Sequence, residues 1–201
     1  MNTVSIVYYT ASGSTALLAE AIARGARSRL GDGVRLFPLT GAQIKEGRWQ
    51  DQPVLDALTA SDALVFGTPT YMGGVAAQFK AFADATGGIW YNRGWKDKVA
   101  GGFTISGSPS GDKQSALSYL SLFAAQHGMT WVGSEPLPVS ATQDPVGVNR
   151  LGSFLGVMAQ NTAKPGTAPE LHPGDARTAE AYGARIAAYA QRLAPARAAA
   201  A

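Results

Sequence analysis

The 201-residue chain contains no cysteine and only two histidines. The lack of thiols excludes disulfides, a cysteine nucleophile and cysteine-ligated metal. Neither His127 nor His172 has a second candidate ligand at the spacing that metal sites use. We therefore expect neither thiol chemistry nor a metal site.

Charged residues are also scarce: they make up 15% of the chain, whereas hydrophobic residues make up 46%. The net charge is +3 without a cluster of Lys and Arg, so nucleic-acid binding is not favoured. No apolar run is long enough to span a bilayer, and the chain opens on a strand pattern instead of a signal sequence, so we expect a cytoplasmic protein without a membrane span. The low charge content also suggests that a partner subunit covers part of the surface.

Strand and helix patterns alternate five times along the chain, which is typical of a doubly wound α/β parallel sheet with helices on both faces. We expect one domain over residues 1–194, followed by a disordered tail at 195–201. A long loop is predicted over residues 141–175. The predicted strands are 4–9, 34–37, 63–68, 99–105 and 129–132, with 137–139 as a candidate continuation of the last, and the predicted helices are 15–30, 54–60, 76–86, 114–127 and 176–193.

Loops of small and polar residues follow the first, third and fourth predicted strands, at residues 10–15, 69–74 and 106–111. In a doubly wound sheet, ligands bind beyond the carboxyl ends of the strands, so all three loops open on one edge. One such loop could arise by chance. Three on one edge predict a single extended ligand with a phosphate at one end.

The first loop has the composition of a phosphate site. It precedes a helix whose first N–H groups lack partners and carry partial positive charge. The hydroxyls of Thr10, Ser12, Ser14 and Thr15 can add donors, and no Lys or Arg lies in the loop. An ordinary helix N-cap also favours Ser and Thr, and the loop alone does not separate the two interpretations.

The common nucleotide motifs do not fit this chain. Residues 107–113 approach the P-loop pattern, but the Gly spacing is one residue short and Asp112 stands where the Lys belongs. Gly13 is not part of a G-x-G-x-x-G run, so a dinucleotide fingerprint is missing as well. The Thr-x-Ser-Gly-x-Thr pattern of residues 10–15 instead suits a lone terminal phosphate.

Several motifs together resemble a known family. Thr10-x-Ser12-Gly13-x-Thr15 is similar to the phosphate loop of flavodoxins. The stretch Phe66–Gly73, reading FGTPTYMG, resembles the flavin-ring loop of WrbA-type NAD(P)H:quinone oxidoreductases. The resemblance continues through the stretch Phe82–Trp90, with its Thr-Gly-Gly-x-Trp block, and through Gln126–Met129. It covers residues 4–139 and, more weakly, the last helix.

This resemblance implies a flavodoxin-like five-stranded sheet in the order 2-1-3-4-5, with FMN as the cofactor and NADH or NADPH as co-substrate. By position, residues 10–15 hold the phosphate, residues 69–73 line the isoalloxazine ring and residues 105–110 contact the ribityl chain and the polar edge of the ring. The implied FMN-binding residues are Thr10, Ala11, Ser12, Gly13, Ser14, Thr15, Pro69, Thr70, Tyr71, Met72, Gly73, Ile105, Ser106, Gly107, Ser108, Pro109, Ser110 and His127.

Trp90 matches an aromatic residue that in that family helps to roof the substrate site across a subunit interface, so the resemblance implies a homo-oligomer, a dimer or a tetramer. From the residues alone, Trp90 equally suits a core or interface position, and His127, just before Gly128, suits a helix cap. The chain departs from the family at Ser12, where an aromatic is common, and at Tyr71, where a basic residue is common.

The expected function is therefore an FMN-dependent NAD(P)H:quinone oxidoreductase. FMN accepts a hydride from NAD(P)H and passes two electrons to a quinone, in ping-pong order, without an essential catalytic side chain. The alternatives are a flavodoxin-type electron carrier and an FMN-binding regulatory protein without quinone turnover. Electron carriers usually dock through a strongly acidic face, whereas here 17 Lys and Arg exceed 14 Asp and Glu.

Overall fold

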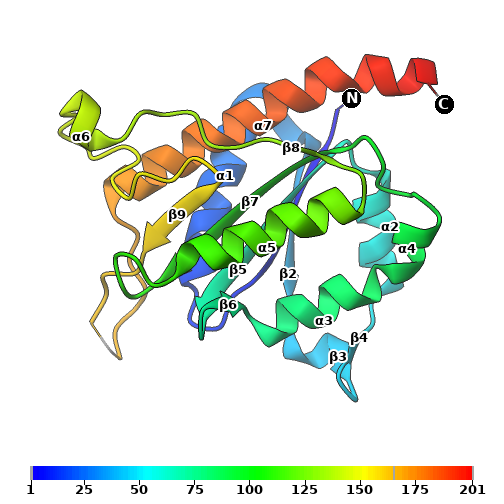
Figure 1. Ribbon diagram of the computed structural model, residues 1–201, viewed down its shortest axis with the longest axis horizontal. Helices are drawn as coiled ribbons and strands as arrows, with labels where there is room; N and C mark the ends of the chain where they lie inside the picture. The colour runs from blue at the N-terminus through cyan, green and yellow to red at the C-terminus, as the bar shows by residue number, and fades with distance from the viewer. Residues whose placement is uncertain (1, 165, 201) are drawn as a thin grey trace.

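The structure, a computed structural model, describes residues 2–164 and 166–200. A parallel sheet in the order β2-β1-β5-β7-β8 forms its centre, and β9 pairs with the second half of β7 (Figure 1). The sheet strands are β1 Val4–Tyr9, β2 Val34–Leu39, β5 Ala63–Tyr71, β7 Val99–Ser106, β8 Thr130–Trp131 and β9 Val157–Gln160.

The register aligns the starts of the strands. Val4 of β1 lies opposite Val34 of β2 on one side and Ala63 of β5 on the other. Ala63 in turn lies opposite Val99 of β7. The strands run in the same direction, so the loops that follow β1, β5 and β7 meet at one edge of the sheet. In the numbering of the predicted strands this order is 2-1-3-4-5, so the flavodoxin-like arrangement is confirmed.

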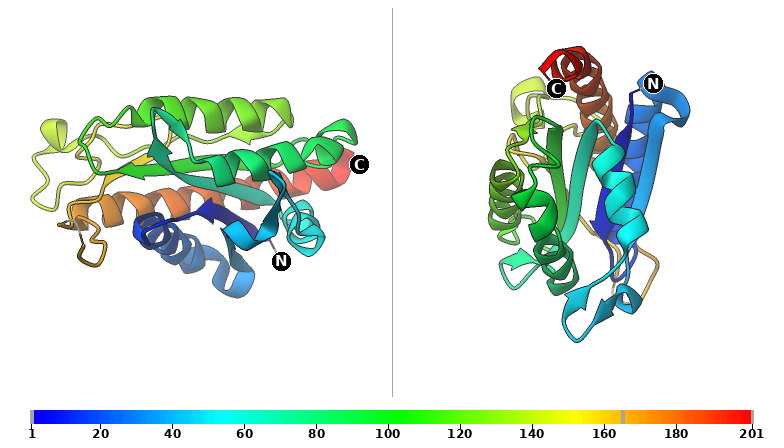
Figure 2. Two further views of the ribbon diagram at one scale, coloured as in Figure 1. Left: turned by 90° about the horizontal axis from the view of Figure 1, so that it is seen from below. Right: turned by 90° about the vertical axis from the view of Figure 1, so that its right-hand side faces the viewer.

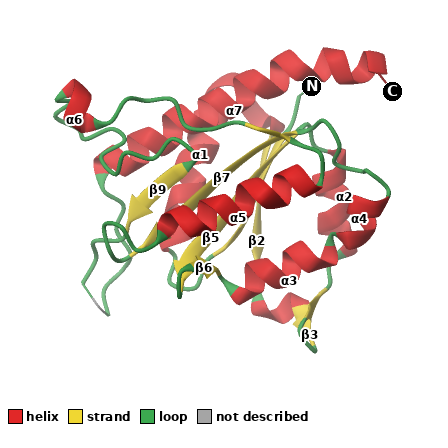
Figure 3. Ribbon diagram, in the orientation of Figure 1, coloured by secondary structure: helices red, strands yellow, loops and turns green. Residues whose placement is uncertain are grey.

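Helices cover both faces of the sheet (Figure 2). α1 and α7 pack on one face, and α2, α3 and α5 on the other, as the secondary-structure colouring also shows (Figure 3). The helices are α1 Ser14–Leu30, α2 Gln52–Ala60, α3 Ala77–Ala85, α4 Gly87–Tyr91, α5 Lys113–Gln126, α6 Val139–Thr142 and α7 Pro173–Ala200.

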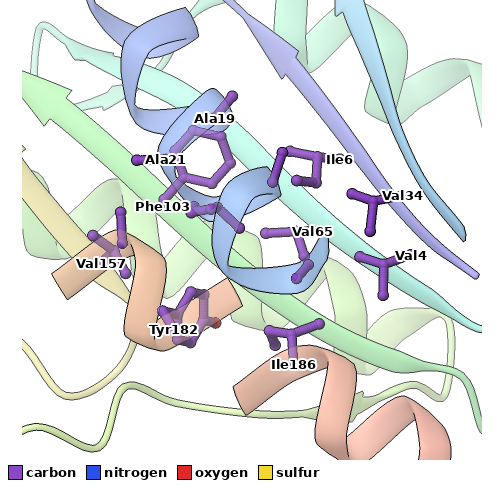
Figure 4. Packing of buried hydrophobic residues seen from close by; sticks show 14 of the residues in the cluster. Val4, Ile6, Ala19, Ala21, Val34, Val65, Phe103, Val157, Tyr182 and Ile186 are labelled. Atoms are coloured by element: carbon purple, nitrogen blue, oxygen red, sulfur yellow. The ribbon is translucent and has the colours of Figure 1, made fainter. Parts of the chain in front are cut away.

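Two apolar cores hold these layers together. On the α1 and α7 face, Ile6 and Val65 of the sheet pack with Tyr182 and Ile186 of α7, all fully buried (Figure 4). On the other face the core contains six buried Phe and Trp side chains among its aliphatic residues, and these rings meet mainly edge to face. Burial of such rings contributes both apolar area and directed ring contacts.

The fifth strand is split, which corrects the predicted continuation at residues 137–139. β8 ends at Trp131, and the strand position is taken up again only by β9 at Val157. Between them the Tyr182 hydroxyl accepts the Gly102 N–H at 3.0 Å and donates to the Val132 carbonyl at 2.7 Å. A side chain from α7 thus completes backbone pairing at the break, so the sequence between β8 and β9 can leave the sheet.

Other local predictions are corrected as well. The predicted loop 141–175 contains the end of α6, all of β9 and the start of α7, which begins at Pro173, a residue well suited to a first helical position. Residues 39–52 contain the short hairpin of β3, Ile44–Lys45, and β4, Arg48–Trp49. The predicted loop 69–74 is mostly a hairpin of β5 with β6, Gly74–Val75.

α7 also continues to Ala200 where the sequence predicts a disordered tail from residue 195. The alanine-rich composition of this segment favours helix. Ala201 lies outside the described residues. In the described part of the chain, no helix combines the length and apolar character that a membrane crossing requires.

Candidate functional site

The three predicted loops meet in one cleft at the carboxyl ends of β1, β5 and β7. The cleft has a volume of about 190 Å³. None of its lining residues carries a formal charge. They are Ala11, Ser12, Ser14, Thr15, Pro69, Tyr71, Ile105, Ser106, Gly107 and Asn161.

The loop between β1 and α1 presents a cradle of free backbone donors. Gly13 has φ +93° and donates its N–H to Thr10 Oγ1 at 3.0 Å, which closes the turn. The Ser12 and Ser14 hydroxyls lie 2.9 Å apart. Among the residues described, no group accepts a hydrogen bond from the N–H of Ser12, Ser14 or Thr15. Free N–H groups at the start of a helix favour an anion, so the cradle suits a phosphate.

The second loop is a rigid hairpin. The Thr68 hydroxyl accepts the Ala76 N–H and donates to the Pro69 carbonyl, each at 3.0 Å. Thr70 is buried, and its hydroxyl pairs with that of Thr104 at 2.8 Å. The hairpin therefore presents Pro69 and the half-exposed Tyr71 to the cleft, while the side chain of Thr70 points into the sheet.

Met72 and Gly73 form the tip of this hairpin, both with positive φ. The Met72 side chain is fully exposed and does not line the cleft. The Gly73 carbonyl accepts a hydrogen bond from the Ser115 hydroxyl in the first turn of α5. The hairpin is thus tied to α5.

The third loop is held from behind by Lys113, the first residue of α5. Lys113 is fully buried, and its Nζ donates to Ser106 Oγ at 2.9 Å and to the carbonyls of Ser108 at 2.6 Å and Pro109 at 3.0 Å. Burial lowers the pKa of the Lys113 ammonium; Asp175 opposes this shift, and Arg150 adds to it. Ser106 and Gly107 reach the cleft, while Pro109 and Ser110 line a separate hollow of about 510 Å³ beside Leu151 and Met158.

Asn161 lines the cleft although the sequence did not indicate it. It directly follows β9, and its Oδ1 accepts the N–H groups of Ala163 at 3.2 Å and Glu170 at 3.4 Å. Pro169 of the same segment lies over the first loop, where it would contact a Cβ on Gly13. The sequence feature that precedes Asn161 is the short apolar run of β9, which lies inside the predicted long loop 141–175.

His127 does not lie in this cleft. It follows α5 at the end opposite Lys113, roughly 20 Å along the helix axis at 1.5 Å per residue. Its ring is buried between Trp95 and Phe123, with centroid distances of 4.5 and 5.0 Å, and its Nε2 lies 2.9 Å from Thr86 Oγ1. Burial, and next the charge of Arg93, lower the pKa of His127 to about 4.

Trp90 is also remote from the cleft of its own chain. It lies on α4, which Figure 1 places at the far end of the molecule from the loop after β7. Its side chain is 44% exposed, and the adjacent Tyr91 is 79% exposed. The two aromatic residues form an exposed pair at this end of the molecule.

No group of three or more metal-ligating side chains occurs within residues 2–164 and 166–200. Arg150 is paired with the buried Asp175 through two contacts of 2.8 Å.

The comparison with protein families adds to this geometry. The sequence model of the family described as NADPH-dependent FMN reductase matches residues 5–143, a range that includes all three cleft loops. The chain belongs to this family. Membership confirms the resemblance stated from the motifs, and with it FMN as the cofactor and a nicotinamide nucleotide as the co-substrate class.

Individual relatives fall into two groups. Flavodoxin FldP from Pseudomonas aeruginosa strain UCBPP-PA14 is 38% identical and aligns over 96% of this chain and 99% of its own length. A solved WrbA-like flavodoxin from Agrobacterium tumefaciens has 37% identity and a TM-score of 0.71, covering 96% and 99% of the two chains. An NAD(P)H dehydrogenase (quinone) from Geobacter sulfurreducens is 36% identical over 65% of this chain and 70% of its own.

Proposed function

We propose that this protein binds FMN in the three-loop cleft and catalyses two-electron reduction of quinones by NAD(P)H in ping-pong order. In the balanced reaction, NAD(P)H, a proton and a quinone give NAD(P)⁺ and a quinol. The observation that carries the proposal is the convergence of a free N–H cradle with two loops at one uncharged cleft.

Each loop has a separate task in this proposal. The N–H groups of Ser12, Ser14 and Thr15 bind the FMN phosphate, with the adjacent hydroxyls as further donors. Pro69 and Tyr71 pack against the ring, and Ser106 and Gly107 contact its polar edge. Bound FMN supplies the hydride chemistry, and the chain binds, orients and shields the reacting partners. The absence of charged residues from the cleft lining fits a site without an acid or base side chain.

The exposed pair of Trp90 and Tyr91 supports a homo-oligomer, either a dimer or a tetramer. Exposed aromatic residues are enriched at subunit interfaces. Because Trp90 lies far from its own cleft, its contact with substrate must be made at the cleft of a neighbouring subunit. His127 is buried within its own subunit, and its position leaves the cleft of that subunit without a histidine.

An electron carrier is the second candidate, and one observation favours it. Flavodoxin FldP is 38% identical over 96% of this chain, whereas an NAD(P)H dehydrogenase (quinone) from Archaeoglobus fulgidus, which also aligns over 96% of this chain, is 29% identical. The excess of basic over acidic residues opposes docking through an acidic face.

An anaerobic titration separates these functions. The protein is loaded with FMN, mixed with NADH or NADPH, and the flavin absorbance is followed before benzoquinone is added. Direct loss of the oxidised flavin spectrum, with recovery on addition of quinone, is expected of the oxidoreductase. FMN binding without reduction by either nucleotide would indicate the carrier or a regulatory protein, and failure to bind FMN would refute the assignment of the cleft.

A further inference from the structure

The third loop is supported by a buried ammonium group without an acidic hydrogen-bond partner. All three acceptors of Lys113 Nζ, the Ser106 hydroxyl and the carbonyls of Ser108 and Pro109, are neutral. Because the Ser106 hydroxyl itself donates to the Ser108 carbonyl at 3.2 Å, each of the three contacts requires a proton from Nζ. The geometry therefore corresponds to the charged form of Lys113, whose burial is unfavourable unless its donors are satisfied.

A second support holds the neighbouring carbonyl. Gln160 Nε2 donates to the Gly107 carbonyl at 3.0 Å, and the Gln160 N–H donates to Asp175 Oδ2 at 3.0 Å. The carbonyls of Gly107, Ser108 and Pro109 are thus all bonded to the protein behind the loop. In a planar trans peptide the N–H points away from the carbonyl. The N–H groups of Ser108 and Ser110 have no acceptor in the described part of the chain, so they are free for a ligand.

The charges behind the loop do not cancel. Asp175 is bound by both arms of Arg150, at 2.8 Å each, and so neutralises that guanidinium. Two cations, Lys113 and Arg150, and one carboxylate leave a net charge of +1. Lys113 Nζ is one hydrogen bond away from Ser106, which lines the cleft. Inside a protein such a charge is weakly screened and acts on a neighbouring site.

We propose that Lys113 is a positioning residue of the flavin site: it fixes the third loop with its N–H groups free for FMN, and its uncompensated charge stabilises reduced FMN more than oxidised FMN. This inference rests on the proposed binding of FMN in the cleft. Hydride transfer to a neutral ring adds one negative charge, so a nearby cation raises the reduction potential of the bound flavin.

Two lysines of this chain form a matched pair for the test. Lys98 Nζ also donates to two backbone carbonyls, those of Thr59 at 2.8 Å and Ser61 at 2.6 Å. It lies just before β7, at the edge of the sheet opposite the cleft. Lys98→Met therefore removes a lysine–carbonyl clamp of the same kind without changing the charge near FMN.

The first measurement is the two-electron midpoint potential of bound FMN, equilibrated with a reference dye. Lys113→Met is expected to bind reduced FMN about tenfold more weakly relative to oxidised FMN, which lowers the potential by about 30 mV. Lys98→Met is expected to keep the wild-type potential. If Lys113→Met does not fold, Lys113→Gln keeps an amide donor but removes the charge, and the same fall is expected. An unchanged potential in the folded neutral variant would overturn the electrostatic role.

The second measurement is hydrogen exchange in the FMN-free protein, which does not depend on the proposed function. Peptides covering residues 105–112 are expected to exchange faster in Lys113→Met than in both wild type and Lys98→Met. Equal exchange in all three proteins would overturn the positioning role. A wild-type protein that binds no FMN would refute the proposed function, while this exchange comparison would still decide whether Lys113 fixes the loop.

Discussion

The hydroxyl of Tyr182 lies 2.7 Å from the carbonyl oxygen of Val132, at the point where the fifth strand leaves the sheet. The same hydroxyl accepts the N–H of Gly102 at 3.0 Å. A Cβ on Gly101 would lie 2.3 Å from this oxygen, so a glycine is required there for the approach. One buried side chain from α7 thus substitutes for a missing strand partner.

Tyr182→Phe is expected to destabilise the protein by about 1–3 kcal/mol, because two buried backbone groups lose their partner. Urea unfolding measures this loss. Tyr189→Phe is the control, since the Tyr189 hydroxyl makes only a 3.5 Å contact with Arg185 at the surface of α7. FMN affinity should not change in either variant, and a stability loss of similar size in both would contradict the bridging role of Tyr182.

Gly13→Ala is expected to weaken FMN binding. Gly13 has φ +93°, and an added Cβ would lie 3.1 Å from Pro169 Cγ, so the substitution strains the turn and displaces the segment above it. The strain should lower stability by about 1–2 kcal/mol. Gly31→Ala is the matched control. Gly31 also has a positive φ, +52°, but it lies at the other end of α1, where an added Cβ would contact no other atom. Fluorescence titration with FMN should show lost affinity in Gly13→Ala alone; equal losses would point to global destabilisation.

His127 is expected to make stability depend on pH. In the unfolded chain it gains a proton as the pH falls through about 6.5, whereas its pKa of about 4 keeps the folded form neutral. Its stabilisation is therefore complete above pH 6.5 and is lost as the pH falls toward 4, by up to about 3 kcal/mol. The comparison is urea unfolding of wild type and His127→Gln, which keeps a polar group for Thr86, between pH 7.5 and 4.5.

The stability difference between these two proteins should shrink or reverse as the pH falls. A constant difference across this range would mean that His127 does not contribute the dependence. FMN affinity measured at pH 7.5 should be the same in wild type and His127→Gln, because His127 does not line the cleft.

Trp90→Ala is expected to weaken subunit association by about 2 kcal/mol, roughly 30-fold in the dissociation constant, because truncation of an interface Trp removes a large buried contact. Light scattering at falling protein concentration measures the change. Phe154→Ala, which removes a similarly exposed ring from the segment between β8 and β9, serves as the control. A monomeric wild type, or equal association in all three proteins, would contradict the proposed role of Trp90.

Much of the site followed from short-range patterns. The Thr-x-Ser-Gly-x-Thr loop and the two later small-residue loops were placed correctly at one sheet edge, because the carboxyl ends of parallel strands point to the same edge. The cleft is lined by Ala11, Ser12, Ser14, Thr15, Pro69, Tyr71, Ile105, Ser106 and Gly107 from these loops and their borders, and binding of FMN by these residues stays a prediction.

The other features of the candidate site depend on contacts between segments that are distant in the sequence. Asn161 reaches the cleft only because β9 rejoins β7 after the insertion, a pairing that the four-residue β9 pattern was too short to reveal. The sequence placed a lysine next to a loop, but only the packing of α5 buries Lys113 and turns it onto the carbonyls of that loop. His127 shows the opposite case, since its motif indicates a flavin neighbour while the length of α5 puts it at the other end of the domain.

Local hydrophobic periodicity and turn chemistry are readable in the sequence, so the sequence was enough to predict the alternation of strands and helices, the edge of the sheet at which the three loops meet and the hydroxyl-rich composition of the first loop. Only the tertiary structure decided how the fifth strand is interrupted, which residue completes the cleft and which charge lies behind it. These depend on side chains, such as those of Tyr182, Gln160 and Lys113, that bond to backbone groups on other elements.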